Sequence, residues 1–310
     1  MEYHLVNIII LLFLLTYTHR VNCSTEITDD EKAAIENGLA VGSALAEALK
    51  DGDFADSLVK LGTNLASFLG VLGPLAGILL AFIPGGDSEE LIFMREKFEE
   101  VNVKLDVITA EFTEVKNIID WRTVVVSYST YEMKITAAKD NLNRIYRVQG
   151  QTREDEKEHF IIQYESDFEN SVQKLYDVIV YNDHFISDNI LQAVVQQTKN
   201  HKRETEQFSL GLVQLLIQGF KVKISYYGMK EWATDHLVTE WESKMTTLRN
   251  TLQTVSFDVK SRWLSQMKLD TKDLLLRYHG LGNQGLADKL YNFVTCREVR
   301  LVILVRGRLR

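Results

Sequence analysis

The chain has 310 residues, of which 45% are hydrophobic and 25% charged, the composition of an ordinary globular protein. Its formal net charge of -8 gives no support to nucleic-acid binding, because a nucleic-acid partner requires a basic surface. The two prolines are Pro74 and Pro84, so residues 85–310 contain none. Because proline breaks helices and marks loops, this distribution favours long helices joined by few turns.

Residues 1–23 are predicted to be a secretory signal peptide. Val6–Leu15 is almost wholly apolar, and Val21 and Cys23 supply the small residues of a cleavage site. An uncleaved anchor is the alternative, although the apolar core is short for a membrane span. After cleavage Cys296 is the one remaining cysteine, so we expect a secreted chain without an internal disulfide. The thiol of Cys296 is then either buried or links two chains.

Residues 24–60 are expected to form acidic helices. Thr28-Asp29-Asp30-Glu31 matches the capping-box pattern that opens a helix, and Asp51-Gly52 is expected to end it. The apolar residues between them recur at spacings of three and four, which predicts one buried face. Asp53 is placed to cap a second helix that leads into the next segment.

The segment 61–86 is uncharged throughout, since no charged residue occurs between Lys60 and Asp87. A continuous helix over 61–83 would be about 34 Å long, enough to cross about 30 Å of hydrocarbon. If Gly73-Pro74 instead forms a turn, the two arms are too short to cross alone. Glycine commonly ends a helix and proline suits the first position of the next, so the sequence favours an apolar helical hairpin.

Small residues recur through this segment at spacings of three and four, and on a continuous helix they would share one face. They are Gly62, Ala66, Gly70, Gly73, Gly77 and Ala81. In lipid such a face lets two helices approach closely. Three interpretations compete: a constitutive membrane span, a buried core hairpin with no function of its own, and a conditional inserter that leaves the protein for a bilayer. In the hairpin case several protomers would have to contribute to one pore.

Residues 87–296 are predicted to form a long helical bundle. Its clearest pattern is an unbroken heptad seam with alternating spacings of three and four, which requires a partner helix in the same chain or in another. The seam consists of Leu91, Met94, Phe98, Val101, Leu105, Ile108, Phe112, Val115 and Ile119.

Further apolar stripes at helical spacing occur over 161–179, 208–222 and 232–255, the last on one long helix that includes Trp232. The expected fold is therefore all-α: an elongated bundle of long antiparallel helices with an apolar helical hairpin. Residues 297–310, REVRLVILVRGRLR, alternate like a strand and carry five arginines. They form a basic apolar tail, interpreted either as a truncated or alternative terminus or as a contact for anionic lipid.

Sequence signals of catalysis and metal binding are weak. The histidines are scattered, and neither His-Glu-x-x-His nor Cys-x-x-Cys nor Gly-x-Ser-x-Gly occurs in the sequence. Asp183 lies beside His184, but an acidic residue next to a histidine is common on helix surfaces. We therefore expect a protein that is not an enzyme and needs no cofactor.

The stretch from Leu65 to Trp121 resembles the cephalotoxin-like proteins and the related rapunzel proteins. The resemblance lies in the Gly/Leu-rich run that ends at Ile83 and in a later set of residues. That set is Ser88-Glu89, Met94-Arg95, Phe98, Val101-Asn102, Lys104-Leu105-Asp106, Ile108, Trp121 and Tyr226-Tyr227-Gly228. The resemblance implies a secreted or membrane-associated all-helical protein; the toxin members suggest toxicity and the rapunzel members do not. The ending after Cys296 departs from the helical continuation that the family leads one to expect.

These observations favour a secreted, membrane-active protein of the pore-forming kind, with the lipid membrane and further copies of itself as partners. Gly70, Gly73, Pro74 and Gly77 would shape the hairpin. The expected lipid contacts are Phe68, Leu72, Leu79 and Phe82. The first alternative is a non-toxic extracellular structural or matrix protein whose hairpin stays in its core, and the second is a single-pass membrane protein.

Overall fold

The protein is described by a computed structural model over residues 29–50, 53–79, 89–118, 125–181 and 189–296. All regular structure in these residues is helical, which confirms the predicted all-α class. The helices are α2 (Asp29–Lys50), α3 (Phe54–Leu79), α4 (Glu89–Ile118), α5 (Val125–Arg147), α6 (Gln151–Gln163), α7 (Ser171–Val180), α8 (Ile190–Gln197), α9 (Lys202–Met229), α10 (Asp235–Arg277) and α11 (Asn283–Cys296), with a π-helical turn, η2 (Tyr164–Phe168), between α6 and α7. The predicted signal peptide, Asp183-His184, Phe82 and the basic tail lie outside the described residues.

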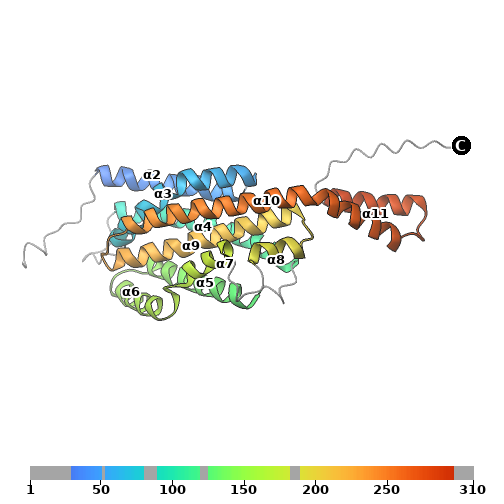
Figure 1. Ribbon diagram of the computed structural model, residues 1–310. Coiled ribbons are helices and arrows are strands. Elements are labelled where there is room, and N and C mark those ends of the chain that lie inside the picture. The colour runs from blue at the N-terminus through green and yellow to red at the C-terminus, as the bar shows by residue number, and fades with distance from the viewer. Residues whose placement is uncertain (1–28, 51–52, 80–88, 119–124, 182–188, 297–310) are drawn as a thin grey trace, which may run out of the picture.

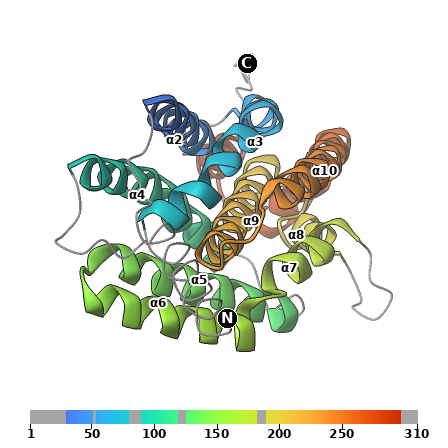
Figure 2. The same ribbon diagram turned by 90° about the vertical axis from the view of Figure 1, so that its left-hand side faces the viewer.

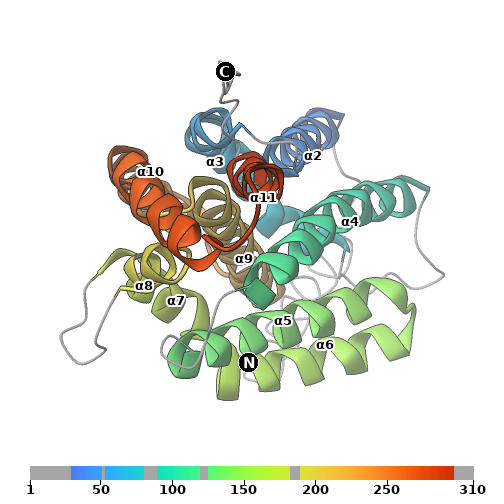
Figure 3. The same cartoon turned by 90° about the vertical axis from the view of Figure 1, so that its right-hand side faces the viewer.

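The long helices run side by side and give the molecule an elongated shape (Figure 1). Seen along the bundle, α9 lies in the centre, with α2, α3 and α4 on one side, α5 and α6 on another, and α7, α8 and α10 on the third (Figures 2 and 3). The second half of α10 extends beyond the bundle and packs with α11 (Figure 1).

The sequence of α9 explains its central position. Every residue from Phe208 to Val222 is buried, so this helix has no water-facing side over four turns. A helix buried on all sides is typical of a core element surrounded by other helices. The predicted stripe over 208–222 therefore describes one part of a fully buried surface.

One predicted stripe spans several helical segments, and one predicted helix start is wrong. The stripe over 161–179 is divided between α6, η2 and α7, with Asn170 between the last two. Trp232 lies outside α10, because α9 ends at Met229 and α10 begins at Asp235. In the turn between them Glu231 adopts a left-handed backbone conformation with φ of 56°, which a continuous helix does not allow.

The described residues of the heptad seam face neighbouring helices of the same chain. Met94, Phe98, Val101 and Leu105 are each at most 2% exposed, and α4 packs against α9 and α2. The side chains of Leu91, Ile108, Phe112 and Val115 lie outside the description, as does Ile119 entirely.

The expected turn at Gly73-Pro74 is wrong, because α3 runs through both residues as one helix. Proline in a helix removes the hydrogen bond to the carbonyl four residues before it, which here is that of Gly70. Pro74 and Gly70 both lie on the exposed side of α3. Water can therefore donate a hydrogen bond to the Gly70 carbonyl in place of the missing N–H. Gly73 lies on the buried side and provides close packing rather than a helix end. The helical hairpin that does form consists of α2 and α3, which pack against each other.

Candidate membrane-inserting helix

The buried face of α3 is formed by large apolar side chains. They are Leu58, Leu61, Leu65, Phe68, Leu69, Leu72 and Leu75, each at most 3% exposed. This face packs against α2, α9 and α10. Burying a leucine or phenylalanine side chain stabilises a fold by about 1.5–3 kcal/mol, so these residues hold α3 in place through the hydrophobic effect.

The opposite face of α3 is small and uncharged. Thr63, Ser67, Gly70 and Pro74 are exposed on it. The hydroxyl of Thr63 donates a hydrogen bond to the carbonyl of Val59, 3.3 Å away in its own helix. Because this face carries no charge after Lys60, α3 can leave water without removing an ion from its hydration shell.

Two glycines of α2 leave room for side chains of α3 to pack closely. A Cβ atom built on Gly42 would lie 2.4 Å from the ring of Phe68, and one built on Gly38 would lie 2.4 Å from a methyl group of Val71. Asp53 fixes the start of α3, since its carboxylate accepts hydrogen bonds from the backbone N–H groups of Ala55 at 2.9 Å and Asp56 at 3.3 Å.

The C-terminal half of α3 packs against the end of α9 and the start of α10. A Cβ atom on Gly73 would lie 2.7 Å from the methyl group of Thr234, and one on Gly228 would lie 2.4 Å from the carbonyl oxygen of Gly73. Gly77 approaches the carbonyl oxygen of Gly228 as well, with 3.5 Å to a built Cβ. Gly73 and Gly77 therefore both contact α9 in the folded chain.

Polar contacts between α3 and its neighbours are confined to one end. The hydroxyl of Ser57 donates a hydrogen bond to the carbonyl of Ala48 in α2 at 2.6 Å. Beyond Ser57, the described side chains of α3 form neither a hydrogen bond nor an ion pair with another helix. Non-directional apolar contacts thus hold most of α3 in the bundle.

The neighbouring helix α4 is attached differently, through a buried polar cluster between α4, α5 and α9. The ammonium group of Lys221 donates to the side-chain oxygen of Asn102, and Gln218 donates to Asp106 at 3.0 Å. Lys139 of α5 forms an ion pair with the same Asp106 at 2.9 Å. Burial lowers the pKa of Lys221 to about 8, because a low-dielectric surrounding disfavours the charged ammonium.

The predicted membrane-inserting residues occupy different environments. Phe68 and Leu72 face the core, Gly73 is buried, Gly77 is half-buried and Pro74 is exposed. Leu79 is the last residue of α3, and its side chain lies outside the description. The sequence did not reveal that Gly73 packs against Thr234 and Gly228, because helical periodicity does not report contacts between distant segments.

By length and composition, the stretch Phe54–Gly77 of α3 could cross a membrane. Core helices of soluble proteins meet the same criteria, and much of this stretch is buried in the bundle. The buried side chains named above therefore fit both a core helix and a stored membrane helix.

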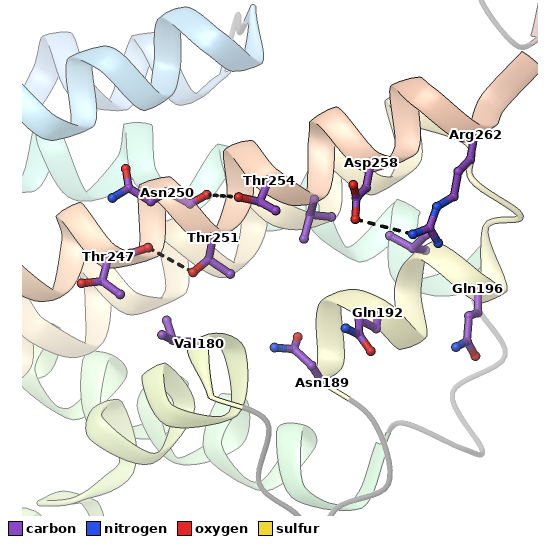
Figure 4. Close-up of a pocket in the computed structure, with 12 residues that line it drawn as sticks. Val180, Asn189, Gln192, Gln196, Thr247, Asn250, Thr251, Thr254, Asp258 and Arg262 are labelled. Atoms are coloured by element: carbon purple, nitrogen blue, oxygen red, sulfur yellow. Dashed lines mark hydrogen bonds and ion pairs between the residues drawn. The ribbon is translucent and has the colours of Figure 1, made fainter.

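A separate groove of about 550 Å³ lies between α8 and α10 (Figure 4). Amide and hydroxyl side chains dominate its wall, among them Asn189, Gln192 and Asn250. The hydroxyl groups of Thr251 and Thr254 donate to backbone carbonyls of α10, and Asp258 pairs with Arg262 at 3.7 Å. The described residues hold no group of three or more His, Cys, Asp or Glu side chains arranged to bind a metal ion.

Comparison with known proteins places this fold in a class. Residues 84–280 match the family model described as the cephalotoxin-like middle helical domain, which is well over half of the chain. The fold and the match together define an all-helical protein of a toxin-related class. The chain belongs to the cephalotoxin-like family.

No curated protein and no solved structure matched the chain significantly. The family match begins after α3 and ends before α11, so it covers α4 to α10. The matched residues therefore do not include α3.

Proposed function

We propose that the protein is a secreted, non-enzymatic cytolysin-like protein that permeabilises target membranes by releasing α3 from the bundle into the bilayer. The observation that carries this proposal is the contrast between α3 and α4. Apolar contacts hold α3 beyond Ser57, whereas α4 is held by the Lys221 cluster. Apolar contacts can be replaced by lipid tails at small cost, but polar groups moved into lipid without partners cost several kcal/mol each.

The dimensions of α3 also support insertion. It has 26 residues and is therefore about 39 Å long, which exceeds the roughly 30 Å of bilayer hydrocarbon. Because the helix is continuous through Gly73-Pro74, one copy of α3 is long enough to cross alone. A water-filled pore would still need α3 from several protomers, which makes a homo-oligomer part of the proposal.

The glycines of α3 suit such an assembly. Gly70 lies in open space in the folded chain, and Gly73 and Gly77 would be uncovered when α3 leaves α9. Small residues on one side allow close contact between helices in lipid. Secretion accords with the toxin-related family and with the predicted signal peptide.

The second candidate is a non-toxic extracellular structural protein in which α3 stays in place. The fit of Phe68 into the surface at Gly42, and of Gly73 against Gly228, favours this candidate, since such close packing is typical of a permanent core. A constitutive single-pass protein is the third, and it would need detergent from the start of purification.

Gly70 offers a test that leaves the fold intact. A Cβ atom there meets nothing within 4 Å, so Gly70→Glu fits the folded protein, while in the bilayer it places a carboxylate about midway along the apolar stretch. Dye release from lipid vesicles should be abolished in Gly70→Glu and retained in the matched control Gly70→Ala, with both variants helical. Equal release by Glu and Ala variants, or no release by the wild type on any lipid, would exclude insertion of α3.

A further inference from the structure

An aromatic cluster lies at the end of α9 and in the turn that follows it. Tyr226 and Tyr227 pack on the hydrophobic core, but the outermost ring, Trp232, is not explained by core packing. We call Tyr226, Tyr227, Lys230 and Trp232 the aromatic tip. Trp232 is 49% exposed, although tryptophan is one of the most costly side chains to leave in water. Its ring packs edge-on against Tyr227 at 5.2 Å and against Tyr226 at 5.7 Å between ring centroids.

The turn holds Trp232 in a fixed position. Glu231 has a left-handed backbone with φ of 56°, a conformation that non-glycine residues seldom adopt. The backbone N–H of Trp232 donates to the carbonyl of Tyr227 at 2.9 Å, which closes the turn. A left-handed residue with hydrogen bonds of this kind is a common way for a helix to end, and here it fixes the place of Trp232 after α9.

The side chain of Lys230 lies beside these rings. The ammonium group of Lys230 lies 5.6 Å from the ring centre of Trp232 and 6.0 Å from that of Tyr226, and it pairs with Glu165 at 3.0 Å. The phenol of Tyr226 donates to the same carboxylate at 2.7 Å. The aromatic tip thus presents an apolar body with polar groups around it, and its one cation is paired with a carboxylate.

The aromatic tip lies at the end of the bundle where α3 finishes (Figure 1). Gly228, which lies between Tyr227 and Lys230, and Thr234, which follows the tip, are the residues that contact Gly73. A surface that binds the aromatic tip would therefore lie beside the C-terminal half of α3.

We propose that the aromatic tip docks the protein on the membrane–water interface before α3 is released. Tryptophan and tyrosine are the residues enriched at this interface, because the ring enters the acyl boundary while its polar atom stays hydrated. Lysine takes the same position with its stem buried and its ammonium among the headgroups. Lys230 is paired with Glu165, and the exposed Glu231 and Asp235 beside the turn are acidic, so the tip has no attraction for anionic headgroups and zwitterionic lipid is the expected surface. This inference rests on the proposed function and names its first step.

Flotation with phosphatidylcholine vesicles tests the docking step separately from pore formation. The variant is Trp232→Ala, and its matched control is Tyr291→Ala, an aromatic residue that is 63% exposed on α11 at the other end of the molecule. Trp232→Ala should lower the vesicle-bound fraction about tenfold, as expected for loss of about 1.4 kcal/mol of interfacial binding. Trp232→Tyr should restore most of the binding, and Tyr291→Ala should bind like the wild type.

The possible outcomes separate this inference from the proposed function. Equal binding of Trp232→Ala and the wild type, or equal losses in both alanine variants, would overturn the docking role even if dye is released. No binding of the wild type to vesicles would also overturn it. Binding that depends on Trp232 but is never followed by dye release would support docking and overturn pore formation. Gly70→Glu should bind vesicles normally without releasing dye.

Discussion

Gly228 lies against the carbonyl oxygen of Gly73 so closely that a Cβ atom on Gly228 would be 2.4 Å from it. The backbones of α3 and α9 are in direct contact at this point. The buried leucines on either side can pack at full density because no side chain separates the two helices here. In the proposed mechanism this contact is broken when α3 leaves the bundle.

Gly228→Ala should weaken the attachment of α3. The added methyl group meets backbone rather than a flexible side chain, so α3 or α9 must shift, at a cost of about 1–3 kcal/mol. Thermal unfolding should move to lower temperature, and dye release should start at a lower protein concentration. Gly70→Ala is the control, because its methyl group enters open space and should leave stability unchanged or raise it by up to about 1 kcal/mol. A Gly228→Ala protein as stable as the wild type would contradict the close contact.

Lys221 should make the protein more stable as pH rises above neutrality. Burial lowers the pKa of its ammonium from 10.5 to about 8, so between these values the unfolded chain binds a proton that the folded chain does not. The free energy of unfolding therefore rises with pH in this window, by up to about 3 kcal/mol. Denaturant midpoints at pH 7.5 and 9.5 should increase for the wild type and change less for Lys221→Met. The pKa of Lys223 is also lowered by burial, so part of the increase in stability with pH should remain in Lys221→Met.

At still higher pH the trend should reverse. Burial raises the pKa of the Tyr146 and Tyr164 phenols above 10, so the folded chain keeps protons that the unfolded chain loses. Stability then falls as pH increases beyond about 10. A maximum in the denaturant midpoint between pH 8 and 10.5 is the expected result, and a steady fall from pH 7.5 upwards would show that Lys221 is charged and hydrated.

Removing α11 should leave the bundle intact. Among the described helices, α11 packs mainly on the projecting half of α10, and the match to the cephalotoxin-like domain ends at residue 280. A chain that stops after Gly280 should keep the unfolding midpoint of the wild type within a few degrees. Its helical signal should fall by the contribution of the removed residues alone. Loss of cooperative unfolding would instead make α11 part of the core.

Much of the fold could be predicted from the sequence because helical periodicity reports burial directly. The apolar residues of α2 at spacings of three and four, such as Ile35, Leu39 and Leu49, are all buried. Asp53 caps α3 as its position before a helix suggests. Met94 and Phe98 of the seam are buried, with partner helices in the same chain.

The sequence was misleading at Gly73-Pro74. Local rules assign glycine to a helix end and proline to a helix start, and both residues satisfy those rules. The helix continues because Gly73 is needed for contact with Gly228 and Thr234, while Pro74 faces water. Tertiary contacts of this kind leave no local signal.

The buried polar cluster also escaped prediction, although a signal exists. Gln214, Gln218 and Lys221 follow one another at spacings of four and three in the largely apolar central part of α9. Such a polar stripe on a fully buried helix requires partners on a neighbouring helix, which are Asn102, Asp106 and the carbonyl of Leu105.

A reversible crosslink can show which helices separate. A Cβ atom on Gly38 would lie 3.1 Å from that of Val71, so cysteines at these positions are within a few tenths of an ångström of disulfide geometry and would tie α3 to α2. If dye release persists with this crosslink, α2 leaves the bundle together with α3. If release stops, α3 separates from α2.

The release of α3 from α9 and α10 is tested most directly by the pair Gly73→Cys and Thr234→Cys, whose Cβ atoms would be 3.1 Å apart. The pair is placed in the chain without the predicted signal peptide and with Cys296→Ser, so that no other thiol competes. Dye release from vesicles is measured for the oxidised protein before and after addition of reductant. We predict no release while the disulfide is closed and full release once it is reduced. Equal release from the oxidised and the reduced protein would contradict the proposal that α3 must leave the bundle.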